Sequence, residues 1–201
     1  MPSGRRRGSL EGRRHPASAA RRAPHPLLLE CHPVIETIEK HTISVLVDNE
    51  PGVLARVIGL FSGRGYNIES LTVAETDTAQ QLSRITIVTS GTRMVIEQIK
   101  NQLDRLVPVH RVRDLTDEGP HIERELALIK VAGTGEKRIE SLRIADIFKA
   151  RIVDVTLNSF VFELTGTAEE LNDFIGIMSQ LGMVDVSRTG VVAISRGTGA
   201  L

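Results

Sequence analysis

The sequence predicts an α+β fold of two tandem ferredoxin-like (βαββαβ) units, in which two helices cover one face of an antiparallel sheet. Two observations predict this fold. Strand and helix patterns follow one another in that order from Thr42, and the same order returns after the polar link Thr116–His121. The composition agrees, because 41% hydrophobic and 25% charged residues are typical of a globular protein.

The first unit contains four strand patterns and two helix patterns. Alternation at Ile43, Val45 and Val47 predicts the first strand, since successive side chains of a strand point to opposite faces. The other predicted strands are Tyr66–Thr76, Leu82–Thr89 and Val107–Val112. Apolar residues at helical spacing predict one helix carrying Leu54, Val57, Ile58 and Phe61, and another carrying Ile96, Ile99, Leu103 and Leu106.

The second unit repeats this order. The predicted strands are Leu126–Val131, Ile152–Leu157, Phe160–Leu164, Val184–Val186 and Val191–Ile194. One helix is predicted over Glu136–Ala150. A second begins after Thr167, which forms a capping box with Glu170. Each unit has only about 75 residues and leaves sheet edges or one sheet face uncovered, so we expect the protein to oligomerise.

The first 40 residues differ from the rest. Residues 1–29 hold seven arginines and one acid; removing them from the 25 basic and 25 acidic residues leaves 18 basic and 24 acidic. This segment lacks periodic apolar residues and is expected to be disordered. It is consistent with a non-functional extension or wrongly chosen start, with an organelle transit peptide, or with a nucleic-acid-binding arm.

Few residues offer catalytic chemistry. No pair of histidines has metal-ligand spacing, and His41 and His110 are expected on the surface beside strands. The glycine-rich stretch Gly133–Lys137 lacks Walker spacing and is interpreted as a strand-to-helix turn. No apolar run approaches the roughly 18 residues of a membrane span. The single cysteine, Cys31, favours a reducing compartment. The sequence therefore favours a binding protein over an enzyme.

Nucleic acid is a poor candidate ligand for the folded part. RNA-recognition modules of this topology stack bases on aromatic residues, and the strands at Ile43–Val47, Tyr66–Thr76 and Leu82–Thr89 carry only Tyr66. Phe160 and Phe162 fit one apolar sheet face equally well. The mildly acidic body also disfavours phosphate binding.

The turn Asp48–Gly52 is the most informative site candidate. It joins a strand to a helix N-terminus, whose free backbone N–H groups attract an anion. Gly52 admits close backbone approach, and Asn49 offers a hydrogen-bond donor and an acceptor. The turn therefore suits an amino-acid ligand; alternatively, Pro51 and Gly52 merely shape the start of the helix.

Two sequence stretches resemble known proteins. Residues 43–54, ISVLVDNEPGVL, resemble the opening of an ACT domain, a small-ligand sensor of this topology. Residues 56–73, RVIGLFSGRGYNIESLTV, resemble the first ACT domain of acetolactate synthase (acetohydroxyacid synthase) small, regulatory subunits. Residues 152–156, IVDVT, and 188–197, RTGVVAISRG, extend this resemblance to about Lys40–Gly197.

The resemblance implies a function in valine, leucine and isoleucine biosynthesis. It implies a chain that is not itself an enzyme, but activates a catalytic (large) subunit that forms 2-acetolactate from pyruvate. Thiamine diphosphate, magnesium and FAD are expected on that partner, with no cofactor or metal on this chain. It also implies feedback inhibition, most often by valine. The expected location is the cytoplasm, or an organelle if the N-terminus is a transit peptide.

The resemblance further implies a homodimer formed through the ACT domains, with valine in the seam. The implied ligand-binding residues are Asn49, Gly52, Val53, Asn67 and Ile68, and Ala74 matches a position linked to loss of feedback. We expect an extension at 1–40, an ACT domain at 41–114, a linker at 115–123 and a C-terminal ACT-like domain at 124–201. The alternative is a free-standing ACT sensor that regulates transcription or another enzyme.

Overall fold

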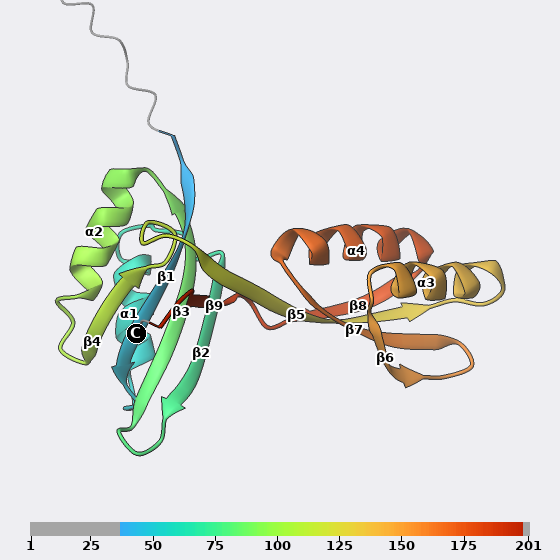
Figure 1. Cartoon of the computed structure of the whole chain (residues 1–201), viewed down its shortest axis with the longest axis horizontal. Helices are drawn as coiled ribbons and strands as arrows, with labels where there is room; N and C mark the ends of the chain where they lie inside the picture. The colour runs from blue at the N-terminus through green and yellow to red at the C-terminus, as the bar shows by residue number, and fades with distance from the viewer. Residues whose placement is uncertain (1–36, 199–201) are drawn as a thin grey trace, which may run out of the picture. The chain divides into compact units, whose positions relative to one another are not determined.

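The computed structural model describes residues 37–198 and contains two lobes, each a mixed α/β unit (Figure 1). The elements of the first lobe are β1 (Glu39–Asp48), α1 (Val53–Ser62), β2 (Ser70–Asp77), β3 (Leu82–Gly91), α2 (Arg93–Leu103) and β4 (Val109–Asp114). Those of the second are β5 (His121–Ala132), α3 (Glu136–Ile147), β6 (Arg151–Val155), β7 (Ser159–Gly166), α4 (Ala168–Leu181), β8 (Met183–Arg188) and β9 (Val192–Ser195).

Both sheets are antiparallel and have the predicted ferredoxin-like order. The first runs β2-β3-β1-β4, and the second runs β6-β7-β5-β8. The α+β fold class and the two βαββαβ units are therefore confirmed. None of the helices among residues 37–198 has the length and apolarity that crossing a membrane requires.

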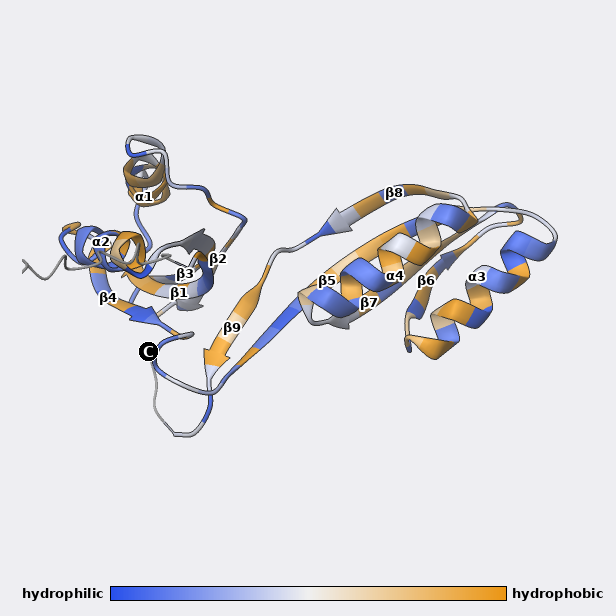
Figure 2. Ribbon diagram, turned by 90° about the horizontal axis from the view of Figure 1, so that it is seen from above, coloured by the Kyte–Doolittle hydropathy of each residue, from blue (hydrophilic) through white to orange (hydrophobic). Residues whose placement is uncertain are grey.

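Each lobe has its own core between sheet and helices. In the first, the inward residues of β1 and β3 pack against α1 and α2, with Ile43, Val45, Val57 and Ile99 at 0–1% exposure. In the second, Ile129 and Phe162 pack against Phe174 and Met178 of α4. Figure 2 shows polar and apolar residues alternating along α4, as expected for a helix with one buried face.

Some predicted boundaries shift. β1 begins at Glu39, inside the extension predicted to be disordered, whereas residues 1–36 lie outside the described part of the chain. β2 begins at Ser70 instead of Tyr66, because the Tyr66 N–H bonds the Phe61 carbonyl at the end of α1 and not a neighbouring strand.

The second lobe extends further toward the first than the sequence pattern predicts. β5 begins at His121, and its first four residues pair with β9, whereas its later residues pair with β7 and β8. The residues that join the lobes are not all polar surface, because Leu115 is 3% exposed and packs with Val88 and Val191.

The predicted capping box of α4 is present. The Glu170 N–H donates to the Thr167 hydroxyl at 3.3 Å, and the Thr167 N–H donates to the Glu170 carboxylate at 2.8 Å. Thr167→Ala is therefore expected to lower the free energy of unfolding by about 1 kcal/mol, the usual effect of losing an N-cap side chain. Urea unfolding measures this, and the exposed Thr165→Ala serves as the control; equal stability of both variants would contradict the prediction.

Candidate functional site

The turn between β1 and α1 leads into a helix N-terminus that no side chain caps. Gly52 is the N-cap of α1, with φ +89°, and no side chain caps this helix. The first turn of α1 carries no acidic residue, so no side chain of that turn offsets the positive end of the helix dipole. A Cβ placed on Gly52 would meet nothing within 4 Å, so the space beside this helix end is open.

The neighbours of Gly52 have different roles. The backbone N–H of Asn49 donates to the Gln81 carbonyl at 2.7 Å, which fixes the turn and leaves the exposed Asn49 side chain available. The Val53 side chain is buried in the first core at 4% exposure. Val53 can therefore offer a ligand its backbone N–H, which makes only a 3.4 Å contact with the Glu50 carbonyl.

Asn67 and Ile68 lie in the segment that leads into β2. The Asn67 carbonyl accepts a hydrogen bond from the Thr89 hydroxyl at 2.6 Å, and its side chain is exposed. Ile68 is half-buried against the first core. The segment is thus fixed through its backbone while its side chains remain accessible.

The strand register separates these two groups within one chain. Asp48, beside the turn, lies opposite Leu82 at the start of β3, whereas Ser70, after Ile68, lies opposite Val88 near its end. At about 3.4 Å per residue, six residues of β3 span roughly 20 Å. The turn and the Asn67–Ile68 segment therefore lie at opposite ends of the sheet, too far apart to hold one amino acid.

β2 is an edge strand with an apolar surface beside it. It ends the sheet order β2-β3-β1-β4, and Ala74 is exposed on it. Val73 of β2 is 42% exposed, and Leu54 and Ile58 of α1 are each 37% exposed. Figure 2 shows α1 as hydrophobic along most of its length, because both its buried and its exposed faces carry apolar residues.

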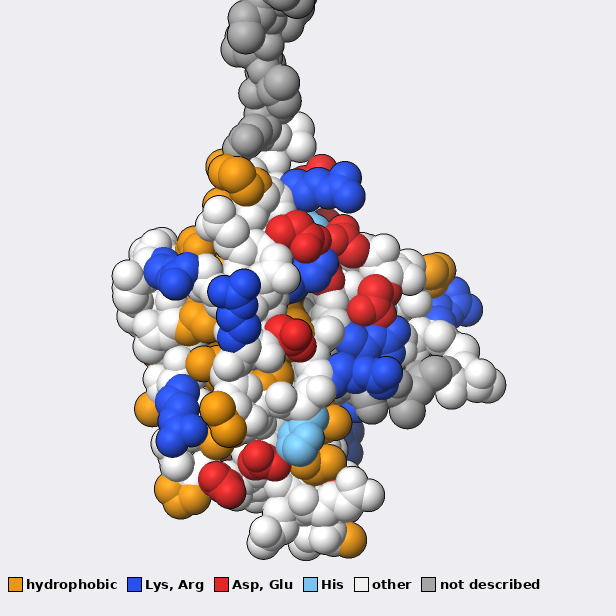
Figure 3. All heavy atoms as spheres, turned by 90° about the vertical axis from the view of Figure 1, so that its left-hand side faces the viewer, with side chains coloured by type: hydrophobic (Ala, Val, Ile, Leu, Met, Phe, Trp, Pro, Cys, Tyr) orange, Lys and Arg blue, Asp and Glu red, His pale blue; other side chains and the backbone are white. Residues whose placement is uncertain are grey.

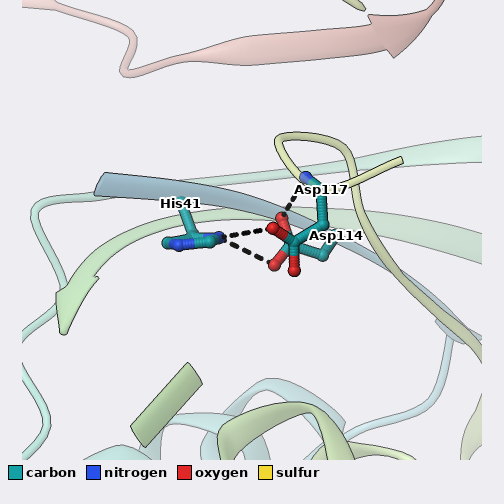
Figure 4. A group of neighbouring side chains, drawn as sticks. All are labelled: His41, Asp114 and Asp117. Carbon is teal, nitrogen blue, oxygen red and sulfur yellow. Dashed lines mark hydrogen bonds and ion pairs between the residues drawn. The ribbon is translucent and has the colours of Figure 1, made fainter. Parts of the chain in front are cut away.

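His41 does not lie on the surface, contrary to the sequence-based prediction. It is 3% exposed, and its Nδ1 lies 2.8 Å from the Asp114 carboxylate, which is 1% exposed (Figure 4). The strand alternation explains this position, because His41 is in phase with the core residues Ile43 and Val45. His110 is exposed as predicted and pairs with Asp48 at 2.6 Å.

His41, Asp114 and Asp117 form the one group in the described chain whose His and carboxylate atoms lie close enough to share a metal ion. Protein contacts already occupy these groups. The other Asp114 oxygen accepts the N–H groups of Thr116 and Asp117 at 3.1 and 3.4 Å, and Lys100 lies 3.7 Å from Asp117. Through these hydrogen bonds Asp114 connects His41 of β1 to the residues that follow β4, so the group has a structural role.

The remaining candidates favour structural roles. Gly133–Lys137 connects β5 to α3, as predicted for a strand-to-helix turn, and Glu136 in the first turn of α3 disfavours an anion there. Phe160 and Phe162 are buried at 4% and 0% exposure, so they cannot stack on bases. On the face drawn in Figure 3, basic and acidic side chains are interspersed.

Two family profiles match the chain. Residues 43–111 match the acetohydroxyacid synthase small subunit-like ACT domain, and residues 124–197 match the small subunit of acetolactate synthase. The two matches correspond to the first and second lobes.

Individual relatives agree with these profiles. The probable acetolactate synthase small subunit of Archaeoglobus fulgidus is 50% identical over 158 residues, which cover 79% of this chain and 98% of that protein. The isozyme 3 small subunit of Escherichia coli is 48% identical over 159 residues, covering 79% of this chain and 96% of the relative.

The crystal structure of the acetolactate synthase small subunit from Thermotoga maritima has the same fold. It superposes with a TM-score of 0.72 at 38% identity, covering 80% of this chain and 99% of that one. Family profiles, full-length relatives and a solved structure thus agree on both lobes. The chain belongs to the family of acetolactate synthase small subunits.

Proposed function

We propose that this chain is the regulatory subunit of acetolactate synthase, which activates a separate catalytic subunit and confers feedback inhibition by valine. The observation that carries the sensing role is the division of the candidate ligand residues between two ends of one sheet. A site divided in this way becomes complete only when a second copy supplies the other half.

A two-fold homodimer satisfies this requirement. In an isologous pair the turn of each chain faces the Asn67–Ile68 segment of its partner, so one seam contains two equivalent sites. The edge strand β2 and the exposed Leu54, Ile58 and Val73 support pairing at this side, because a dimer would cover apolar surface and an open sheet edge.

The chemistry of the two halves suits a branched-chain amino acid. The ligand carboxylate lies against the backbone N–H groups at Gly52 and Val53, where the first turn of α1 holds no acidic residue. The amides of Asn49 and Asn67 hold polar atoms of the ligand, and Ile68 offers apolar contact to its side chain. Ala74, on the same edge strand, affects how closely the two chains approach.

The remaining assignments follow from this role. Thiamine diphosphate, magnesium and FAD belong to the catalytic subunit, and the complex acts in the cytoplasm. Sensing belongs to the ACT domain at 41–114, which the linker 115–123 joins to the C-terminal domain at 124–201.

Reconstitution tests the proposal directly. The purified chain alone, supplied with pyruvate and the three cofactors, should form no 2-acetolactate. Added to its catalytic subunit, it should raise the activity and make it valine-sensitive, and sedimentation should show a dimer that valine stabilises. Acetolactate formation by the chain alone, or no effect on the catalytic subunit, would refute the proposal.

Asn67→Ala is expected to weaken valine binding by roughly 1–3 kcal/mol, because it removes one hydrogen-bonding side chain without adding repulsion. The fold should be unaffected, since Asn67 is held through its backbone carbonyl. Calorimetric titration gives the affinity, and Asn101→Ala, at another exposed asparagine on α2, is the matched control. Unchanged binding in Asn67→Ala would remove this residue from the site.

A further inference from the structure

Ser70 and Thr72 of β2 contact Thr189, Gly190 and Val191, which lie between β8 and β9. We call these five residues the Gly190 junction. The Val191 N–H donates to the Ser70 hydroxyl at 2.8 Å, and the Thr72 hydroxyl donates to the Thr189 carbonyl at 3.4 Å. The two lobes belong to the same unit of the chain. The junction is therefore a direct backbone-to-side-chain connection between them.

Gly190 makes this close approach possible. Its φ of +84° is a left-handed conformation that favours glycine. A Cβ at this position would lie 2.6 Å from the Ser70 hydroxyl oxygen and 3.0 Å from that of Thr72. Any larger residue would have to displace the Ser70 hydroxyl, which accepts the Val191 N–H, and crowd the Thr72 hydroxyl.

The two residues before Gly190, Arg188 and Thr189, anchor the junction in the second lobe. The Thr189 N–H donates to the Leu126 carbonyl at 3.0 Å. Arg188 Nε donates to the buried Glu125 carboxylate at 2.8 Å, and a second Arg188 nitrogen donates to Asn172 on α4 at 2.7 Å. A displacement of residues 189–191 would therefore reach both β5 and α4.

On the other side, the junction adjoins the proposed ligand residues. Ser70 follows Ile68 by two residues and lies opposite Val88, which packs with Val191. Glu69, between Ile68 and Ser70, forms an ion pair with Lys40 at 3.0 Å. The hydroxyl of Ser90 and the ammonium of Lys40 hold the pKa of Glu69 below its ordinary value. A cavity of about 460 Å³ borders the junction, so its side chains have room to rearrange.

We propose that the Gly190 junction couples the ligand seam to the second lobe, so that inhibition needs the junction while ligand binding does not. Valine at Asn67–Ile68 fixes the start of β2, and Ser70 and Thr72 pass that constraint to residues 189–191. This coupling rests on the proposed function. It adds that the second lobe takes part in transmitting the ligand signal to the catalytic subunit.

The test compares binding with inhibition in the full chain reconstituted with its catalytic subunit. For Gly190→Ala, couplings of the usual 5–150-fold size predict a rise of at least about fivefold in the valine concentration for half-inhibition, with the Kd for valine within about threefold of the parent. Ser70→Ala and Thr72→Val, which each remove a junction hydrogen bond without adding a clash, should show the same separation to a smaller degree.

Gly197→Ala is the matched control. Its φ is +92°, close to that of Gly190, but a Cβ there meets nothing within 4 Å. The synthase reconstituted with Gly197→Ala should be inhibited by valine at the same concentration as with the parent. If the junction variants keep parental inhibition, or if binding and inhibition weaken in parallel, the coupling is wrong. If the parent itself does not bind valine, the proposed function fails.

Discussion

Gly52→Asp is expected to lower the affinity for valine by about a thousandfold. The new carboxylate would stand beside the ligand carboxylate at the N-terminus of α1. Like charges about 4 Å apart at an effective dielectric constant of ~20 repel by roughly 4 kcal/mol. A Cβ at Gly52 meets no neighbour within 4 Å, so the variant bears the strain of the left-handed φ without a clash and should still fold.

Gly52→Ala separates the charge from the backbone effect. Alanine meets the same left-handed φ of +89° but brings no charge, so any loss common to both variants comes from the altered turn. Titration with valine, leucine and isoleucine, alongside inhibition of the reconstituted synthase, provides the measurements. If the Gly52→Asp chain folds, activates the catalytic subunit and leaves the synthase as valine-sensitive as the parent does, the valine site lies elsewhere.

Asp114→Ala is expected to lower the free energy of unfolding by about 3 kcal/mol or more, because each buried polar group left without its partner costs roughly 1–3 kcal/mol. The substitution leaves His41 buried at 3% exposure without its 2.8 Å partner. It also frees the N–H groups of Thr116 and Asp117, which begin the connection to the second lobe.

The exposed pair of Asp48 and His110 provides a matched control within the same sheet. These side chains lie 2.6 Å apart but are 38% and 50% exposed, so Asp48→Ala should cost less than about 1 kcal/mol. Urea unfolding of both variants tests the difference. Similar losses from the two substitutions would mean that burial does not set the strength of the His41–Asp114 connection.

The order of strands and helices could be predicted because periodicity is a local property of the sequence. Ile43, Val45 and Val47 indicate a buried strand face without reference to the rest of the chain, and that face is the first core. The pairing of residues 121–124 with β9 could not be predicted, since it joins short segments about 70 residues apart and depends on three-dimensional register.

The candidate site likewise has one part that local sequence predicts and one part that it does not. The turn could be located from its Asn, Pro and Gly, because a strand-to-helix turn has local chemistry. That Asn67 lies at the opposite end of the sheet follows only from the register of β3 with its two neighbours. His41 was misplaced because a polar residue was assumed to be exposed, although its phase along β1 already indicated the core.

The packing of Val191 and Ala193 against Val88 and Leu115 has a consequence for synthesis on the ribosome. The first lobe can form its own core once β4 has emerged, but Val88 and Leu115 stay uncovered until Val191 is made. At 5–20 residues per second, the 76 residues from Leu115 to Val191 take roughly 4–15 s. During that interval the nascent chain presents an apolar strip that chaperones or another nascent copy can bind.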